Sequence, residues 1–297
     1  EITTRLVGSE MCIRDSFTRF TFKNTTERLE HHEEAPSLKE CLHLLLTNRP
    51  LLMLFLGNIF FVIIKVSEQA SFYFAYDALF NAKYNGFLDI AKAPGSFLAG
   101  IFVPIIIERL GRKADSKKFY QVCCVMGIVL NGLFALCTYN GIMNKGAGQS
   151  VSLLTGLMVI VFSAVVTFPL EFKNLMQKEM EAETVDYVEW KTGKRVEGTM
   201  LSIMSFTGKL EGTLSSFICL QVLARTGYVE HTTDVSTLQN HSTLLGLFLM
   251  TTVFPMVGYA LMLIPMHFYN ITGDSHRRMI KDIMARRAQA GEAAAQE

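Results

Sequence analysis

The chain has 297 residues, of which 50% are hydrophobic and only 19% carry a charged side chain. A soluble protein of this length needs more charge to cover its surface, so the composition excludes an ordinary soluble domain and indicates an integral membrane protein. The formal net charge of +1 gives no basic excess, which excludes binding to nucleic acid through a strongly basic surface.

The N-terminal segment, residues 1–16, differs from the rest of the chain. It has no cleavable signal pattern, and its sequence EITTRLVGSEMCIRDS resembles translated sequencing-adapter sequence. We therefore expect residues 1–16 to be a non-native, adapter-derived segment and the natural protein to continue upstream of it.

Residues 17–50 are predicted to form a cytoplasmic linker. The stretch Phe17–Pro36 is polar and charged, which is typical of a flexible segment. Ser37 to Glu40 form a capping-box pattern and leucines follow at helical spacing, which predicts a short amphipathic helix. Pro50 is then expected in the first turn of the first span.

Six stretches are long and apolar enough to cross a bilayer as helices, which takes about 20 residues each. Open sheets are excluded because lipid cannot satisfy their free backbone groups. The fold class predicted is an all-α membrane protein with a six-helix bundle over residues 51–269. The expected spans are Leu51–Tyr76, Phe87–Ile107, Phe119–Tyr139, Val151–Leu170, Met200–Leu223 and Thr243–Tyr269.

Basic residues concentrate in alternate connections and in the tail, residues 270–297, which predicts that these parts and both chain ends are cytoplasmic. The opposite connections carry only Lys83, Lys145 and Arg225. In the tail, Met279, Ile280, Ile283 and Met284 form an apolar stripe among basic residues, which predicts an interfacial helix. The basic residues on the cytoplasmic side are Arg109, Arg112, Lys113, Lys117, Lys118, Lys173, Lys178, Lys191, Lys194, Arg195, Arg277, Arg278, Lys281, Arg286 and Arg287.

Ionisable residues inside the spans cost free energy and usually face a cavity or a partner. Lys65 and Glu68 in the first span are an i,i+3 pair, as are Asp89 and Lys92 in the second. Such pairs can neutralise each other on one helix face. For Lys65 and Glu68 we leave open whether they pair in this way or face a cavity.

We make different predictions for two further pairs of charged residues. Glu171 and Lys173 lie at the end of the fourth span, where long side chains can reach the interface by snorkelling. Lys209 and Glu211 lie near the middle of the fifth span and point about 200° apart on a helix. They cannot pair with each other, so each requires a partner elsewhere or a wet cavity. In the same span, the spacing of Gly208 and Gly212 favours close approach of a neighbouring helix.

Two motifs carry a family resemblance. Residues 108–113 (ERLGRK) resemble the cytoplasmic loop signature of the major facilitator superfamily. Residues 183–198 (ETVDYVEWKTGKRVEG) resemble the signature that glycoside–pentoside–hexuronide:cation symporters carry between their tenth and eleventh helices. Ser37–Pro50 is similar to the central cytoplasmic segment of that family. The resemblance implies cytoplasmic gating residues at Glu108, Arg109, Gly111, Arg112, Glu183, Asp186, Tyr187, Glu189, Arg195 and Glu197.

This resemblance implies that residues 17–297 are spans seven to twelve of a bacterial inner-membrane transporter whose N-terminal six-helix half is missing. The implied function is symport of a small sugar or glycoside with Na⁺ or H⁺ by alternating access. The coupling ion is the only implied cofactor, and no metal site, catalytic residue or nucleic-acid partner is expected. The expected partners are the sugar, the missing half and the lipid bilayer.

The resemblance also implies residues of a substrate and cation cavity. Lys209 matches the lysine that lies near the cation and sugar sites in the eleventh helix of relatives. Melibiose-type members have a cavity tryptophan and a Gln-Thr step where this chain has Asn174 and Met204-Ser205, so a melibiose-like substrate is not expected. Ser205 can still donate to a sugar hydroxyl, and Tyr73 is either a stacking surface or a packing residue. The full candidate set is Lys209, Ser205, Glu211, Lys65, Glu68, Asn174 and Tyr73.

Three other classes compete with a sugar symporter. A lysolipid or other organic-solute carrier of the same fold would have an apolar lateral opening in place of a polar cavity. A non-transporting membrane interaction protein gives no reason for the charges inside the spans. An enzyme is not expected, because the chain has no HExxH, GxSxG or P-loop motif.

Overall fold

The structure, a computed structural model, describes residues 38–80, 83–110, 115–144, 149–193, 197–230 and 238–294. The predicted adapter segment, residues 1–16, and the polar part of the predicted linker lie outside these residues. All regular elements in the described ranges are helical, which confirms the all-α fold class.

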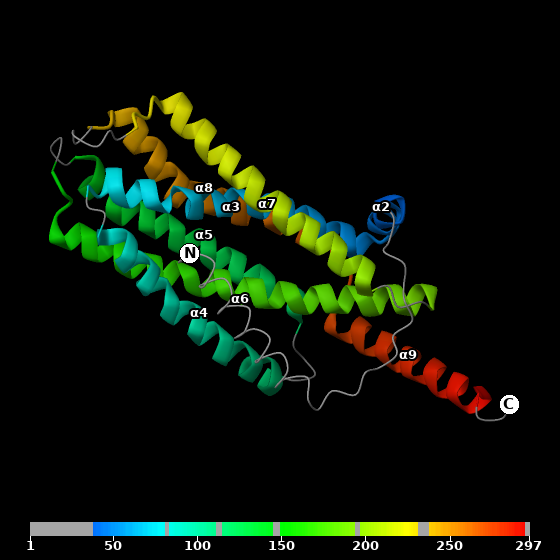
Figure 1. Cartoon of the computed structure of the whole chain (residues 1–297). Coiled ribbons are helices and arrows are strands. Elements are labelled where there is room, and N and C mark those ends of the chain that lie inside the picture. Colours follow the sequence, from blue (N-terminus) through cyan, green and yellow to red (C-terminus); the bar gives the residue numbers. More distant parts are fainter. Residues whose placement is uncertain are drawn as a thin grey trace, which may run out of the picture. The chain divides into compact units, whose positions relative to one another are not determined.

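Six long helices cover the six predicted spans (Figure 1). A short helix, α2 (Leu38–Thr47), precedes them, a π-helical turn, η1 (Phe74–Ala78), extends the first, and α9 (Gly273–Ala294) follows the last. The six are α3 (Arg49–Tyr73), α4 (Lys83–Leu110), α5 (Ser116–Met143), α6 (Leu153–Thr192), α7 (Glu197–Thr226) and α8 (His241–Phe268).

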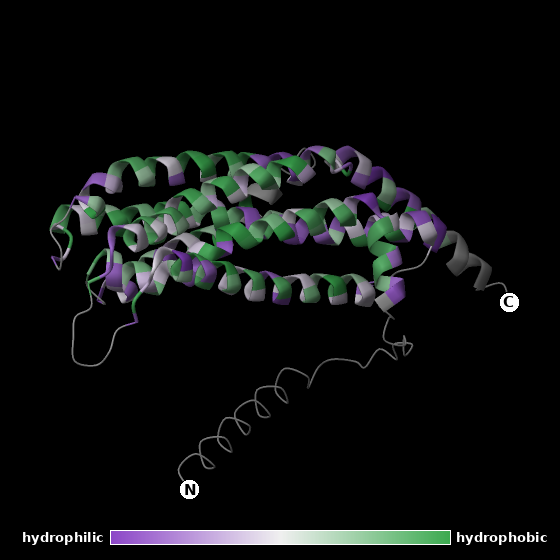
Figure 2. Cartoon of the chain, turned by 90° about the horizontal axis from the view of Figure 1, so that it is seen from above, coloured by the Kyte–Doolittle hydropathy of each residue, from purple (hydrophilic) through white to green (hydrophobic). Residues whose placement is uncertain are grey.

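Four helical segments are long and apolar enough to cross a membrane: Arg49–Ala78, Ser116–Met143, Leu153–Thr192 and His241–Phe268. The other two predicted spans are α4 and α7, which belong to the same bundle. Hydrophobic residues predominate along the bundle helices, and hydrophilic residues gather toward their ends and on α9 (Figure 2).

The helix ends follow from local sequence. The side chain of Asn48 accepts a hydrogen bond from the amide of Leu51 (3.4 Å), and Pro50 lies in the first turn of α3, as predicted. The side chain of Asn240 accepts a hydrogen bond from the amide of Thr243 (2.7 Å) at the start of α8. Gly193 ends α6 with a φ of 73°, a left-handed conformation that glycine adopts without strain.

The bundle is held by a small set of helix contacts. Helix α3 packs against α8 and α7, α8 also packs against α5, α5 against α6, and α6 against α4. At Gly258 the backbone of α8 lies against Ile64 of α3, with no room for a side chain. At Gly208 and Gly212 of α7, in contrast, no described atom of another element lies within 4 Å of the space that a side chain would occupy. This pair therefore leaves a face of α7 open.

Helix α6 continues far beyond the predicted end of its span at Leu170. Its 40 residues make a helix about 60 Å long, twice the thickness of a bilayer core of about 30 Å. The signature segment, residues 183–198, was predicted to connect two spans, but its first ten residues, 183–192, form the last turns of this helix. Met279 and Ile283 of α9 are buried, and α9 contacts α6. These two residues of the predicted interfacial stripe therefore pack against protein.

Candidate functional site

An ion pair joins the middles of α3 and α7. The Nζ atom of Lys65 lies 3.4 Å from Oε2 of Glu211, and the side chains are 27% and 8% exposed. Glu68, the alternative partner of Lys65, is exposed and lines a cavity. From the sequence alone, Lys65 could pair with Glu68 or face a cavity. In the structure its partner is Glu211, on another helix.

Lys173 of α6 is fully buried, so the expectation that it reaches the interface by snorkelling is wrong. Its Nζ atom lies 3.7 Å from the centre of the Phe61 ring and donates to the side-chain oxygen of Gln177 (3.2 Å). It forms no ion pair with any residue that the structure describes. The aromatic ring and the amide oxygen replace part of the hydration that the ammonium group loses.

A chain of polar contacts connects this lysine to α3. The side chain of Gln177 donates to Asn58 (2.7 Å) and to Glu181 (3.1 Å). Sequence reasoning missed these residues, although Lys173, Gln177 and Glu181 recur at the i,i+4 spacing that places them on one helix face. That spacing could have indicated that the three side chains interact.

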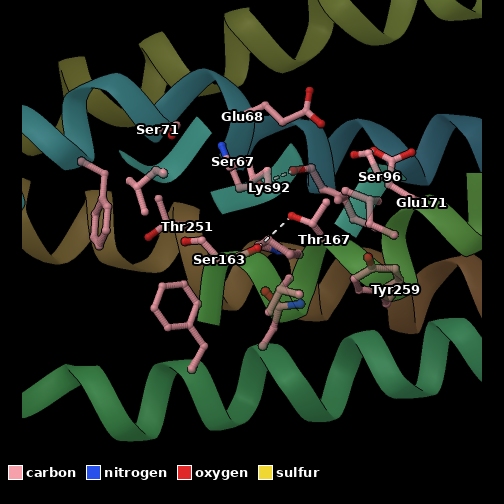
Figure 3. Close-up of a pocket in the computed structure, with 18 residues that line it drawn as sticks. Ser67, Glu68, Ser71, Lys92, Ser96, Ser163, Thr167, Glu171, Thr251 and Tyr259 are labelled. Atoms are coloured by element: carbon pink, nitrogen blue, oxygen red, sulfur yellow. Dashed lines mark hydrogen bonds between the residues drawn. The ribbon is translucent and has the colours of Figure 1, made fainter. Parts of the chain in front are cut away.

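A cavity of about 280 Å³ opens between α3, α4, α5, α6 and α8. On its wall, Ser96 of α4 donates to Glu171 of α6 (3.3 Å). Lys92 also lines it and forms the predicted pair with Asp89, with 3.3 Å between the charged atoms. Figure 3 shows that Ser96 and Glu171 lie together, and that hydroxyl side chains surround the remaining space. The polar lining residues are Ser67, Glu68, Ser71, Lys92, Ser96, Asn131, Ser163, Thr167, Glu171, Thr251 and Tyr259.

Lys209 and Ser205 lie outside this cavity, on an exposed face of α7. Glu211 is buried on the other side of the helix, so the two charges of α7 do point apart. No described residue forms an ion pair with Lys209. The role of Lys209 and Ser205 in a substrate cavity therefore stays a prediction.

Asn174 and Tyr73, two further candidate residues, do not line the cavity. The amide of Asn174 donates to the Glu171 carboxylate at 3.5 Å, next to the cavity. The ring of Tyr73 meets that of Tyr228 edge-on at 5.5 Å, which is a packing contact. Burial and the neighbouring Asp77 raise the pKa of Tyr228 above its usual range.

The signature residues on the extension of α6 contact other helix ends. Glu183 accepts hydrogen bonds from Ser116 (2.9 Å) and from the hydroxyl of Tyr269 (3.3 Å). Asp186 lies 3.0 Å from the ring of His276 on α9.

Further contacts along α6 also involve α9. Glu189 is paired with Arg287 of α9. Within α6 itself, Tyr187 lies beside Trp190, with 6.3 Å between ring centres. Glu197 begins α7. The structure therefore assigns several of these residues to the attachment of α9.

The remaining predicted gating residues are described only in part. Glu108 and Arg109 lie in the last turn of α4, but their side chains are outside the described part of the chain. Gly111, Arg112 and Arg195 lie outside the described residues altogether.

Comparison with known proteins gives consistent matches over most of the chain. The profile of the "MFS/sugar transport protein" family matches residues 16–273. The "Uncharacterized symporter YjmB" of Bacillus subtilis is 25% identical over 267 residues, which are 88% of this chain and 53% of that protein.

Two named carriers are similarly related. The "Glucuronide carrier protein homolog" of Escherichia coli is 24% identical over 264 residues, covering 88% of this chain and 53% of its own length. The "Isoprimeverose transporter" of Lactiplantibacillus pentosus is 24% identical over 271 residues, covering 90% and 52%. The chain thus spans about half the length of the curated relatives it matches.

Proposed function

This chain belongs to the MFS/sugar transport protein family, and on that premise we propose that it forms the C-terminal half of a sugar:cation symporter. The family and the relatives are transporters and not enzymes. The names of the relatives include a glucuronide carrier and an isoprimeverose transporter, in line with the resemblance to glycoside–pentoside–hexuronide symporters. We propose the same broad substrate class, a small sugar or glycoside, for the complete transporter.

The observation that carries this proposal is the open polar face of α7. Ser205 and Lys209 are exposed on it, and Gly208 and Gly212 leave it flat. Lys209 lies 12 residues into the helix, about 18 Å along its axis, and so near the middle of a bilayer core of about 30 Å. A lysine at this depth is unfavourable against lipid. A second helical half that encloses water between itself and α7 removes that cost.

The proposed mechanism is alternating access between two six-helix halves. A sugar and a coupling ion, Na⁺ or H⁺, must both bind the same occluded conformation more tightly than the open ones for one gradient to drive the other. Lys209 would then face the substrate passage, and the Lys65–Glu211 pair would hold α7 in position beside α3. The proposed location is a bacterial inner membrane, with both ends of the chain in the cytoplasm.

A lysolipid carrier of the same fold is the main alternative. The cavity between α3, α4, α5, α6 and α8 favours the sugar, because its wall carries many hydroxyl groups and two carboxylates, those of Glu68 and Glu171. Such a lining suits a ligand that forms many hydrogen bonds and is unfavourable for an acyl chain.

The test is uptake by proteoliposomes that contain the complete transporter carrying this chain. We expect radiolabelled xylosides or glucuronides to accumulate when a Na⁺ or proton gradient is imposed, and not when the gradient is collapsed by an ionophore. Proteoliposomes that contain this chain alone are the control and should show no uptake. Uptake of lysophosphatidylcholine without uptake of any sugar would replace the proposal with the lipid carrier.

A further inference from the structure

A second cavity lies where α9 joins the bundle. Its volume is about 470 Å³, which falls within the range of about 300–1,000 Å³ for small-molecule sites. Tyr187 and Trp190 of α6 form one wall, and the connection from α8 to α9 and the first turns of α9 form the other. It shares no lining residue with the cavity between α3, α4, α5, α6 and α8. We call it the α9 cavity.

The α9 cavity lies at the level where a span leaves the hydrocarbon core. Helix α8 ends at Phe268, and the connection lines the cavity from Asn270 onward. Helix α9 then runs beside the extension of α6 (Figure 1). The polar headgroup layer extends about 5–8 Å beyond each face of the hydrocarbon core, and tryptophan and tyrosine are enriched at this depth. The cavity is therefore within reach of lipid headgroups.

Arg278 supplies a positive charge to the α9 cavity. Its side chain is exposed and lines the cavity, and no described residue forms a hydrogen bond or an ion pair with it. The other arginines of α9 are all engaged. Arg277 pairs with Asp274 at 2.9 Å, and Arg286 and Arg287 contact α6. The charge of Asp274, which also lines the cavity, is thus compensated, whereas that of Arg278 is not.

A negative charge of α9 faces the same space. Asp282 lines the cavity and accepts a hydrogen bond from the indole nitrogen of Trp190 (3.0 Å). No described cation forms an ion pair with it. Arg278 is four residues away on the same face of the helix, yet the two side chains form no ion pair with each other in the described part of the chain. The cavity therefore holds one guanidinium group and one carboxylate whose charges are both uncompensated.

This pattern of charge selects a class of ligand. Arg278 attracts a simple anion but Asp282 repels it, and a simple cation meets the opposite situation. A zwitterion with a phosphate and a primary ammonium group satisfies both side chains. An arginine binds a phosphate through two parallel N–H donors. The Trp190 ring, which is 39% exposed, can hold the ammonium group by a cation–π contact next to the carboxylate.

We propose that the α9 cavity binds the phosphoethanolamine headgroup of a phospholipid. Arg278 binds the phosphate, and Asp282 together with the Trp190 ring binds the ammonium group. The acyl chains remain in the bilayer beside the end of α8. Because Trp190 belongs to α6 and Arg278 to α9, the bound lipid joins the two helices and strengthens the attachment of α9. The inference does not depend on the substrate that the complete transporter carries.

The test uses the 297-residue chain in phosphatidylglycerol vesicles that contain an increasing fraction of phosphatidylethanolamine. Trp190 is the only tryptophan of the chain and lines the cavity, so its fluorescence reports binding. We expect phosphatidylethanolamine to reduce the quenching of Trp190 by acrylamide in a saturable way. Arg278→Gln should weaken this binding at least about tenfold, the effect of losing a charge-assisted hydrogen bond. The matched control is Lys281→Gln, which removes a positive charge from an exposed residue of α9 outside the cavity and should leave the binding unchanged.

A second variant gives a result that loss of structure cannot imitate. Asp282→Asn keeps an oxygen that accepts from the Trp190 indole but removes the charge that pairs with the ammonium group. Arg278 then has no uncompensated carboxylate beside it, so vesicles of phosphatidylglycerol alone should protect Trp190 at least as well as mixed vesicles. Soluble glycerophosphoethanolamine at the same total concentration should give no protection, because it lacks the acyl chains that concentrate the headgroup at the membrane surface.

Three results would overturn the inference. One is an equal response of the wild type, Arg278→Gln and Lys281→Gln to phosphatidylethanolamine. Another is the absence of any response in a wild-type chain whose circular dichroism shows folded helices. The third is equal protection by soluble glycerophosphoethanolamine and by the lipid, since the site would then serve a soluble ligand. Sugar uptake by the complete transporter is a separate measurement, so the proposed function stands or fails independently.

Discussion

Lys65 of α3 and Glu211 of α7 form an ion pair 3.4 Å long near the middle of the bundle. Because the two partners lie on different helices, the pair holds α7 against α3. The opposite face of α7, which carries Lys209, is open. The pair also explains how a glutamate can lie at this depth, since its negative charge is compensated by an adjacent cation.

Removing one partner of this pair should therefore destabilise the bundle. We expect Glu211→Gln to lower the free energy of unfolding by about 2 kcal/mol, less than the 3–5 kcal/mol typical of fully buried pairs, because Lys65 remains 27% exposed. The double variant Lys65→Met with Glu211→Leu should recover most of this loss. Thermal unfolding in nanodiscs, followed by circular dichroism, measures both. A melting temperature of Glu211→Gln equal to that of the wild type would show that the pair contributes nothing.

The buried Lys173 leads to an opposite expectation. It has the Phe61 ring and Gln177 as neighbours but no described carboxylate in ion-pair contact, so its charge is only partly compensated. Lys173→Met, which keeps the unbranched side chain up to the Cε position and removes the charge, should raise the free energy of unfolding by about 1 kcal/mol or more. Uptake by the complete transporter should nevertheless fall, because a cation that reduces stability is retained for function. Loss of stability in Lys173→Met would contradict this reading of the site.

Substitution of Lys209 should affect sugar uptake but not the stability of the bundle. Its side chain is exposed and has no ion-pair partner in the described part of the chain, so Lys209→Gln should change the free energy of unfolding by less than about 0.5 kcal/mol. Sugar uptake by the complete transporter should fall at least about tenfold, which corresponds to about 1.4 kcal/mol. Lys118→Gln is the matched control, because Lys118 is 78% exposed and lies on the predicted cytoplasmic side. Unchanged uptake in Lys209→Gln would remove Lys209 from the substrate passage.

The helices could be predicted from the sequence, because apolar runs of about 20 residues have few alternatives in a bilayer. Local charge pairing could be predicted where it is confined to one helix, as for Asp89 and Lys92. The partner of Lys65 could not, because the sequence does not state that α3 and α7 are neighbours.

The error on Lys173 has a different physical cause. The apolar run ends at Leu170, which suggests an interface there, but α6 continues as a helix to Thr192. Lys173 is therefore surrounded by neighbouring helices and does not reach water. The cavity lined by Tyr259 could not be predicted either, since its wall combines a few residues from each of five helices.

The attachment of α9 to α6 involves the only tryptophan of the chain, Trp190. Its indole nitrogen donates to Asp282 of α9 (3.0 Å), and Arg286 donates to its backbone carbonyl (2.8 Å). Asp186 and His276 form a second contact, 3.0 Å apart. Beneath these polar contacts Ile283 is only 6% exposed. Residues of the family signature thus hold the C-terminal helix against the extension of α6.

A polar residue at Ile283 should release α9, because burial of a hydroxyl without a partner and loss of apolar contact together cost about 2–5 kcal/mol. We expect Ile283→Ser to shift the fluorescence emission of Trp190 to longer wavelength and to increase its quenching by acrylamide, since the indole, 39% exposed while α9 is attached, then becomes more exposed to water. Met284→Ser changes the adjacent residue, which is 65% exposed, and should alter neither signal. If Ile283→Ser and Met284→Ser give the same spectrum as the wild type, α9 is not held on α6 by this face. Its apolar residues would then be free to bind the membrane surface, as the sequence alone predicts.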